Sequence, residues 1–239
     1  MAGLTGRLIA PLRLQHARTR TGAMAPVAVR DRRRRILNVV VALIGLILAA
    51  PMMLVIALLV KLTSPGPVLF VQTRVGLDRR QLGVDAGNGR RQVDHGGRLF
   101  KIYKFRTMRV DTEAHQVWAA PDDPRVTPVG RVLRKFRLDE LPQLINVLKG
   151  DMNIVGPRPE QPAIFAVLRD QVDRYRHRQQ VLPGITGWAQ INHHYDVSIE
   201  DVQHKLRYDL EYVGRRSLWE DAKIMLRTFP VVIFRKGAW

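Results

Sequence analysis

The sequence predicts a mainly helical α/β domain with a short sheet, preceded by an N-terminal membrane helix and completed by amphipathic helices at the membrane interface. Three observations predict this class. The chain has one long apolar run, short stretches in which apolar and basic residues alternate, and apolar residues at helical spacing through its C-terminal half. Its 239 residues are sufficient for one ordinary domain with appendages.

The chain is strongly basic, with a formal net charge of +18 and a calculated pI of about 11.3. This charge implies an anionic partner, which could be a nucleic acid, an acidic lipid surface or a phosphorylated substrate. Charge alone does not choose among them. Cysteine is absent, which excludes disulfides and cysteine-ligated zinc.

Residues 1–35 contain nine arginines and a single acid, Asp31, without a clear hydrophobic period. We expect them to form a disordered basic arm that lies against an anionic membrane leaflet, where each basic residue contributes roughly 1 kcal/mol. Nucleic-acid binding is the alternative use of the arm. No aromatic residue in it could stack on bases, so no nucleic-acid partner is expected.

Residues 36–60 form an apolar run in which only Asn38 is polar, long enough to cross a hydrocarbon core of about 30 Å. Both flanks are basic, so a single crossing would place positive charge on both sides of the membrane. A re-entrant helix that enters and leaves on the cytoplasmic face satisfies both flanks. We therefore predict such a helix at residues 36–63, kinked at Pro51, and keep a full crossing as the alternative. A cleaved signal peptide is less consistent with the long basic leader.

Two short strands are expected after the turn at residues 64–67. The first covers residues 68–71. The second covers residues 100–106, where apolar and basic residues alternate and Lys104 and Arg106 share one face. The polar, glycine-containing residues 78–98 between them predict an extended hairpin or loop, without a phosphate-binding glycine pattern.

The run from residue 123 to residue 160 places the adjacent acids Asp139 and Glu140 among arginines and beside a Gly-Pro-Arg-Pro turn. Thr127-Pro128 predicts one helix start, and Asp139 is predicted to cap a second helix that ends before Gly150. The acids would then lie at a helix N-terminus, which also attracts phosphate. The alternative is that Asp139 is only a cap and Glu140 only a surface residue. The surrounding cations are Arg125, Arg131, Arg134, Lys135, Arg137 and Arg158.

The C-terminal third combines a glycine-punctuated loop with two helical patterns. The loop, residues 184–190, carries Trp188 and Gln190, and the adjacent His193 and His194 do not have metal-ligand spacing. The two predicted stripes consist of Val202, Leu206, Leu210 and Val213, and of Leu218, Ala222, Met225 and Leu226. Core packing and docking at the membrane interface are both open for these helices.

Four segments of the chain resemble the successive motifs of the bacterial sugar transferase family. They are FVQTRVG (70–76), FKIYKFRTM (100–108), LDELPQLINVLKGDMNIVGPRPE (138–160) and LPGITGWAQIN (182–192). The similarity extends from about Arg33 to the C-terminus. The chain departs from the family at Ala50, where a serine usually precedes the central proline, and at Asn38, where an aspartate is common.

The resemblance implies a short, monotopic phosphoglycosyl transferase on the cytoplasmic face of the bacterial inner membrane. Such an enzyme moves a sugar-1-phosphate from a nucleotide-diphospho-sugar to polyprenyl (undecaprenyl) phosphate through a covalent aspartyl-phosphosugar intermediate, in the first membrane step of a glycan pathway such as exopolysaccharide biosynthesis. The short form implies little beyond the catalytic core. The sugar, the nucleotide and the oligomeric state, a homo-oligomer included, stay open.

The resemblance also implies roles for individual residues. Asp139 would be the nucleophile, and Glu140 and Asp139 would hold Mg²⁺. The residues expected to bind substrate phosphates are Lys104, Arg106, Arg125, Arg158 and Gln190, and Trp188 would pack or meet the base. The alternative to this enzyme is a non-catalytic membrane-anchored protein that binds nucleic acid or acts as a scaffold.

Overall fold

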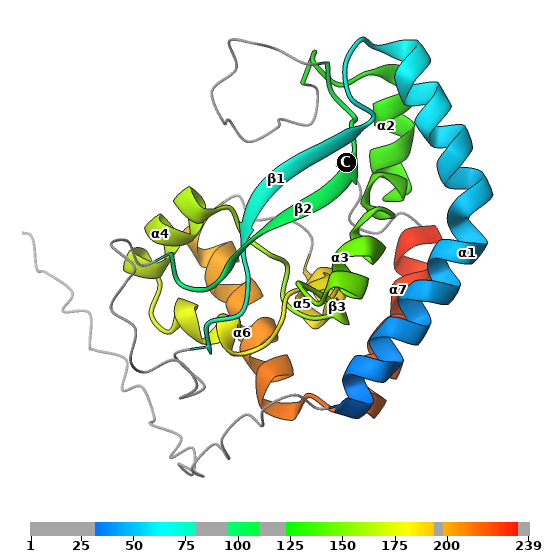
Figure 1. Ribbon diagram of the computed structural model, residues 1–239. Helices are drawn as coiled ribbons and strands as arrows, with labels where there is room; N and C mark the ends of the chain where they lie inside the picture. Colours follow the sequence, from blue (N-terminus) through cyan, green and yellow to red (C-terminus); the bar gives the residue numbers. More distant parts are fainter. Residues whose placement is uncertain (1–31, 80–94, 110–122, 194–197, 234–239) are drawn as a thin grey trace, which may run out of the picture.

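In the computed structural model, the described residues are 32–79, 95–109, 123–193 and 198–233 (Figure 1). These residues form a mostly helical fold with two small two-stranded sheets, as the predicted class requires. Residues 1–31 of the predicted basic arm, residues 80–94 of the predicted loop, and His194 lie outside the described residues.

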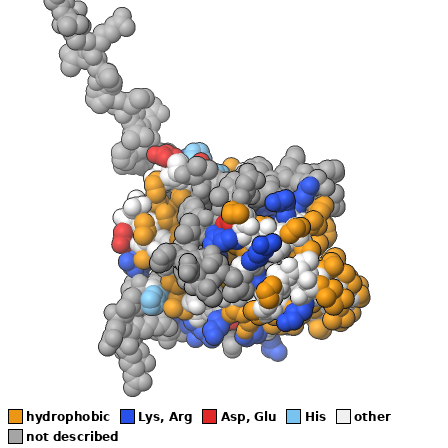
Figure 2. All heavy atoms as spheres, turned by 90° about the horizontal axis from the view of Figure 1, so that it is seen from above, with side chains coloured by type: hydrophobic (Ala, Val, Ile, Leu, Met, Phe, Trp, Pro, Cys, Tyr) orange, Lys and Arg blue, Asp and Glu red, His pale blue; other side chains and the backbone are white. Residues whose placement is uncertain are grey.

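Helix α1, Arg32–Thr63, is one helix of 32 residues that continues past Pro51. It begins at Arg32, so the four arginines assigned to the arm belong to the helix. It is the one helix among the described residues that is long and apolar enough to cross a membrane. Figure 1 shows α1 along one side of the domain, and Figure 2 shows hydrophobic side chains gathered on that side. The exposed members include Ile47, Leu48 and Leu54.

The two predicted strands form an antiparallel ribbon. Strand β1, Leu69–Val75, pairs with β2, Leu99–Phe105, so that Leu69 lies opposite Phe105 and Val75 opposite Leu99. Both strand predictions are confirmed, and the first strand is longer than expected. Along the first part of β2 the side chains of Phe100 and Ile102 are buried and those of Leu99 and Lys101 are exposed, which is the alternation that predicted the strand.

A second, parallel pair joins β3, Asn153–Val155, to β4, Gly184–Thr186. The sequence did not predict these short strands. The backbones of the two strands approach each other closely, and this explains the glycine at the start of β4. A Cβ added to Gly184 would lie 2.0 Å from the backbone nitrogen of Gly156. Glycine is therefore required where the two backbones meet.

Helix α2, Pro128–Lys135, begins as predicted, with the Thr127 hydroxyl accepting a hydrogen bond from the Gly130 amide. Helix α3, Gln143–Lys149, ends at Gly150, whose left-handed φ of 83° confirms the predicted stop. The prediction that Asp139 caps this helix is wrong. Asp139 lies in a preceding one-turn 3₁₀ helix, η2 (Leu138–Glu140), and α3 starts after Pro142.

The physical reason is that the two carboxylates bind cations rather than backbone amides. Residue Arg137, in the left-handed region with φ 54°, starts η2, and no side-chain cap hydrogen bond forms there. The turn is held by i+3 bonds from the Glu140 amide to the Arg137 carbonyl and from the Leu141 amide to the Leu138 carbonyl. The acid pair is thus set on a tight turn instead of at an α-helix N-terminus.

The remaining helices are α4 (Pro162–Gln171), the 3₁₀ segment η3 (Tyr175–Gln180), α5 (Trp188–Asn192), α6 (Ile199–Arg215) and α7 (Leu218–Ile233). Of these helices, α4 contacts β1, and α7 contacts β3 and β4. The stripe predicted for α6 is confirmed, since Val202, Leu206 and Val213 are buried. The stripe predicted for α7 is wrong in part: Leu226 is 67% exposed, while Ile224 is buried.

Both halves of α1 pack on the domain. Two clusters of buried apolar side chains make this contact: Ala42 with Phe100, Ile102, Val147 and Met152, and Ile56 and Val60 with Phe105 and Leu133. One cluster lies in the first half of α1 and the other in its second half. The helix is therefore bound to the domain along its length rather than at one end.

Polar contacts also hold both ends of α1. Near its start, Arg34 forms an ion pair with Asp221 of α7 (3.1 Å), and the Asn38 side chain accepts a hydrogen bond from the Ile154 amide. At its end, the guanidinium of Arg106 donates to the carbonyls of Ser64 (2.7 Å) and Pro65. These carbonyls belong to the turn that directly follows α1, where helical partners are missing.

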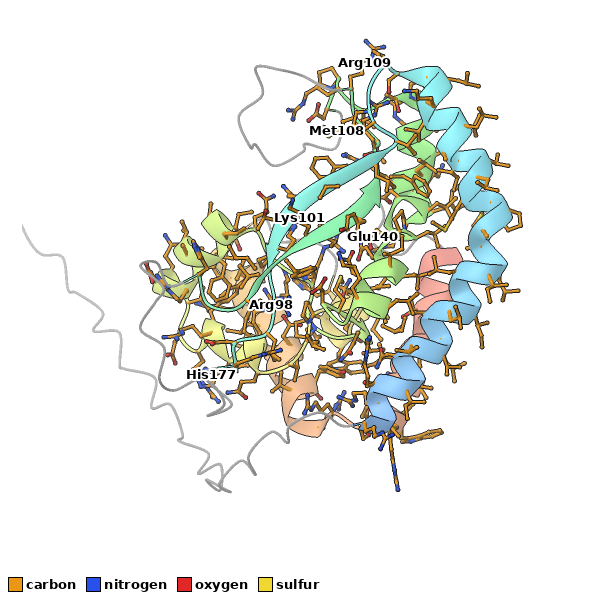
Figure 3. The ribbon with its side chains drawn as sticks, in the orientation of Figure 1. Arg98, Lys101, Met108, Arg109, Glu140 and His177 are labelled. Atoms are coloured by element: carbon orange, nitrogen blue, oxygen red, sulfur yellow. The ribbon has the colours of Figure 1, made fainter. Side chains whose placement is uncertain are left out.

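We predict that Arg106→Met destabilises the fold by about 3 kcal/mol, because hydrogen bonds from a buried charged group to the end of α1 are lost. The measurement is thermal unfolding of the purified protein in detergent micelles. Arg109→Met is the matched control, since Arg109 is an exposed arginine three residues further on (Figure 3). Equal unfolding midpoints for the two variants would show that Arg106 does not secure α1.

Candidate active site

The acid pair is buried beside two cations from different elements. Asp139 is 9% exposed and Glu140 is 6% exposed. Lys104, on β2, places its Nζ 2.7 Å from Glu140 Oε1 and 3.9 Å from Asp139 Oδ2. Arg158 places Nη2 2.9 Å from the same Oε1 atom of Glu140. Figure 3 shows Glu140 between the ribbon of β1 and β2 and helix α1. The structure thus brings together four of the predicted site residues.

Asn146 fixes the distance between the acid pair and Lys104. Its fully buried side chain accepts a hydrogen bond from the Tyr103 amide (3.1 Å) and donates one to the Lys101 carbonyl (2.7 Å). Helix α3 is thereby attached to the edge of β2 directly beside Lys104. Sequence reasoning missed this residue, although one polar side chain between Ile145 and Val147 was a usable signal.

A buried ion network holds the Gly-Pro-Arg-Pro turn that carries Arg158. Arg178, 1% exposed, donates to the Arg158 carbonyl (2.9 Å) and contacts Glu160 (3.2 Å) and Asp209 (2.8 Å). Burial by itself would raise the pKa of Glu160, but the charges of Lys205 and Arg178 outweigh it and lower that pKa below its ordinary value. Sequence reasoning missed this network because its members are far apart along the chain.

The two carboxyls of the pair differ in their affinity for protons. Burial raises the pKa of Asp139; Lys104 counteracts this effect, and the negative charge of Glu140 adds to it. Burial also acts to raise the pKa of Glu140, but the charges of Arg158 and Lys104 exceed it, so this pKa lies below its ordinary value. Glu140 is therefore the stronger acid of the pair, and Asp139 keeps its proton to a higher pH.

Arg106 and Arg125, both expected to bind substrate phosphates, have other partners in the structure. The Arg106 guanidinium is directed to the carbonyls at the end of α1. Arg125 is held by Asp123, with Nη2 2.6 Å from Oδ2, and its hydrogen bonds lower the pKa of Asp123 to about 2. We therefore do not count either arginine among the residues that contact the acid pair.

A pocket of about 250 Å³ reaches Glu140 and Gln190. Gln190, another predicted site residue, donates from Nε2 to the Ile185 carbonyl (2.9 Å). The pocket lies between the segment from Phe136 to Leu144 and the elements β4, α5 and α7. The other lining residues are Phe136, Arg137, Leu138, Leu141, Leu144, Ile185, Thr186, Ile191 and Thr228.

Trp188 packs between neighbouring helices; packing was one of its two expected roles, and contact with the base was the other. Its ring has the guanidinium carbons of Arg215 and Arg227 at 4.6 and 5.4 Å from the ring centre. Its Nε1 donates to Glu211 (2.7 Å). The side chain therefore connects α5 to α6 and α7.

The carboxylates of Asp139 and Glu140 fit a metal site that is completed by waters and substrate phosphates. Among the described residues, no group of three or more His, Cys, Asp or Glu side chains could hold a metal ion. Asp139 and Glu140 together supply two carboxylates, which suits Mg²⁺ held by one or two carboxylates, waters and substrate phosphates. A metal site formed by protein ligands alone does not fit these residues.

The model of the bacterial sugar transferase family matches residues 29–85 and 87–235. The chain belongs to this family. A UDP-N-acetylgalactosamine-undecaprenyl-phosphate N-acetylgalactosaminephosphotransferase of Aeromonas hydrophila is 39% identical over 98% of the chain. A UDP-glucose:undecaprenyl-phosphate glucose-1-phosphate transferase of Escherichia coli is 42% identical over 86% of it. The exopolysaccharide production protein ExoY of Rhizobium meliloti is 34% identical over 92% of it.

The family members differ in length. The chain spans 51% of the Aeromonas relative and 41% of the Escherichia relative, but 92% of ExoY. The match with the two longer proteins therefore concerns only a part of each.

We predict that Glu140→Gln lowers the pKa of Asp139, because a neighbouring negative charge is removed, and that Lys104→Met raises it, because a neighbouring positive charge is removed. NMR titration of the protein labelled with ¹³C at aspartate carboxyls measures both shifts. Lys101→Met is the matched control, since Lys101 is an exposed lysine on the same strand. Shifts of the same sign in the two variants would contradict this account of the pair.

Proposed function

We propose that this protein transfers a sugar-1-phosphate from a nucleotide-diphospho-sugar to polyprenyl phosphate. The observation that carries the proposal is the buried pair Asp139 and Glu140 with Lys104 and Arg158 in contact. Family membership supports it, and two of the relatives above carry this activity in their names. The acceptor of this chain would then be polyprenyl phosphate, and its donor a nucleotide sugar.

In the first step, a carboxylate oxygen of Asp139 attacks the β-phosphorus of the donor. A bond forms between this oxygen and the phosphorus, and the bond from the phosphorus to the bridging oxygen breaks. The nucleoside monophosphate leaves with the bonding electrons, and the sugar phosphate stays esterified to Asp139. The step needs Asp139 in its ionised form, which burial opposes and the charge of Lys104 favours, and the leaving group departs as an anion.

In the second step, a phosphate oxygen of the polyprenyl phosphate attacks the same phosphorus. The new phosphorus–oxygen bond produces a polyprenyl diphospho-sugar, and the carboxylate of Asp139 is released. The two-step route separates two anionic groups in time, since the first leaves before the second approaches. Repulsion between unit charges about 4 Å apart is on the order of 4 kcal/mol near a protein surface.

The other members of the site would act by charge. Lys104 and Arg158 offset the negative charge of the donor phosphates, and Arg158 can make a two-point contact with phosphate oxygens. Glu140 keeps both cations beside Asp139, since both contact its Oε1. Gln190, which lines the same pocket as Glu140, would contact a substrate through its amide.

Mg²⁺ is the proposed cofactor, held by Glu140 and Asp139 together with substrate phosphates. When bound, it would neutralise the charge that develops on phosphate oxygens. The two carboxylates match the oxygen ligands that Mg²⁺ prefers. Glu140 has one oxygen, Oε1, in contact with Lys104 and Arg158, so a metal would share this carboxylate with them.

The proposed location is the cytoplasmic face of the bacterial inner membrane, with α1 re-entrant. Both halves of α1 pack on one domain, through Ala42 in the first half and Ile56 and Val60 in the second. Both ends are also bonded to that domain, through Arg34 and through the carbonyls that receive Arg106. A helix that crossed the membrane could not keep both sets of contacts. The net charge of +18 supports attraction to an anionic leaflet.

We predict that Asp139→Asn abolishes nucleoside monophosphate release and the covalent intermediate, because an amide cannot form the phosphoester. Glu140→Gln should lower activity by about 100-fold, since a charged group of the site is lost, and the loss should depend on Mg²⁺ concentration. The measurements are monophosphate release from a panel of nucleotide sugars and trapping with radiolabelled donor. Asp170→Asn is the matched control, since the side chain of Asp170 is exposed on α4. Near-normal turnover of the Asp139 variant would refute the assignment of the nucleophile.

We predict that cysteines introduced at exposed Arg33 and Lys61 react with a membrane-impermeant thiol reagent from the same side of the membrane. The chain has no native cysteine, so each site is labelled alone. Inverted and right-side-out membrane vesicles give the two sides. Labelling of the two positions from opposite sides would mean that α1 crosses the membrane.

A further inference from the structure

Glu140 has two different kinds of neighbour. Its Oε1 receives Lys104 and Arg158, which are the cations assigned to the donor phosphates. The same residue also lines the pocket of about 250 Å³, whose apolar wall consists of Phe136, Leu138, Leu141, Leu144, Ile185 and Ile191. Glu140, the neighbour of Asp139 in the sequence, therefore lies at the boundary between a cationic region and an apolar one.

The few polar groups of the pocket offer little to a polar ligand. The hydroxyls of Thr186 and Thr228 are bonded to each other at 2.8 Å. The Gln190 Nε2 is bonded to the Ile185 carbonyl, and its Oε1 is buried without a hydrogen-bond partner in the described part of the chain. A buried sugar or nucleoside needs a partner for each of its many polar groups. Apart from Arg137, Glu140 and the Oε1 atom of Gln190, the residues that line the pocket provide no such partner, and hydrocarbon needs none.

The borders of the pocket lead to the exposed apolar surfaces of two helices. Leu144 contacts α1, where a Cβ added to Gly45 would be 3.3 Å from Leu144 Cδ1. Thr228 of α7 is followed by Phe229, which is 66% exposed, and Leu226 on the same helix is 67% exposed. A hydrocarbon chain could reach Glu140 from these surfaces along apolar side chains.

The geometry points to this pocket as the binding site for the isoprene units of the acceptor that are nearest to its phosphate. The inference rests on the proposed function and adds to it the place of the second substrate. An engineered cavity of about 150 Å³ holds benzene, so about 250 Å³ is sufficient for roughly two five-carbon units. The remaining units of a long acceptor would lie along α1 and α7.

Arg137 complements the phosphate of this acceptor. It lines the pocket, and its charge contributes to the low pKa of Glu140, so it lies near the acid pair. Its backbone is in the left-handed region, with φ 54°, which is uncommon for a residue with a side chain. This positive charge lies where the apolar pocket reaches Glu140, as the binding of an amphiphile with a phosphate head requires.

The test fills the pocket and measures the two half-reactions separately. Ile191→Trp adds bulk inside the pocket, and Asn192→Trp is the matched control at the neighbouring, exposed position. Ile191→Trp should raise the KM for polyprenyl phosphate by about 10-fold or more, because the first isoprene units are excluded. Monophosphate release with donor alone, and the KM for donor, should stay within about twofold of the unmodified protein. The control should change none of these values.

The outcomes separate this inference from the proposed function. A raised KM for donor with an unchanged KM for acceptor would assign the pocket to the donor and overturn the inference. Unchanged values for both substrates would overturn it as well. If the unmodified protein released no monophosphate from any nucleotide sugar, the proposed function itself would fail.

A second measurement uses the unmodified protein and does not depend on how the tryptophan variant folds. An isoprenoid phosphate with a photoreactive diazirine on its second isoprene unit is bound and irradiated, and the labelled peptides are identified by mass spectrometry. We expect labels within residues 136–144 and 185–191, which line the pocket. Labels confined to α1, or found equally with a lipid that carries the same diazirine but no phosphate, would overturn the inference.

Discussion

The contact between the buried acid pair and its two cations is the interaction on which the rest of the site depends. Two adjacent carboxylates at 9% and 6% exposure would repel each other strongly without positive charge nearby. Lys104 and Arg158 supply that charge from opposite parts of the chain, one on a strand and one on a turn. Both cations contact one oxygen of Glu140, at 2.7 and 2.9 Å, whereas Lys104 lies 3.9 Å from Asp139, so Asp139 is held less closely than its neighbour.

Much of the surrounding structure can be understood as support for this contact. Asn146 attaches α3 to β2 and so sets the position of the acids against Lys104. The network around Arg178 holds the carbonyl of Arg158 and thereby the turn that carries its guanidinium. Both supports are buried, where hydrogen bonds are costly to leave unmade. Substitutions at these positions would act on the proposed reaction by displacing Lys104 or Arg158, since neither Asn146 nor Arg178 contacts the acid pair.

Helix α1 combines two roles that usually belong to different elements. One face belongs to the domain core at Ala42, Ile56 and Val60, and the other exposes apolar side chains such as Leu48 and Leu54. The domain is consequently held close to any hydrocarbon that contacts the exposed face of α1. The segment that carries the acid pair, and the pocket that reaches Glu140, lie against this helix through Leu138 and Leu141. This arrangement suits the proposed transfer from a water-soluble donor to a lipid acceptor.

The sequence alone determined the elements whose causes are local. The apolar run predicted α1, alternation predicted β2, and Thr127 with Gly150 marked two helix ends, because these signals depend on neighbours within a few residues. It also singled out Asp139 and Glu140, since adjacent acids among arginines are visible without a fold. The prediction that Asp139 caps a helix was wrong because it considered only the neighbouring backbone amides. Cations that are distant in the sequence are the partners of the acid pair.

Only the tertiary structure decided which cations meet the acids. Lys104 and Arg106 were equal candidates on one predicted strand face, yet β2 ends at Phe105 and Arg106 turns to the carbonyls at the end of α1. Arg125 is bound by Asp123, two residues away. Long-range packing decides which basic residues contact the acid pair, because an arginine binds the acceptors that the fold brings within its reach. The distance between two residues in space cannot be read from their positions in the sequence.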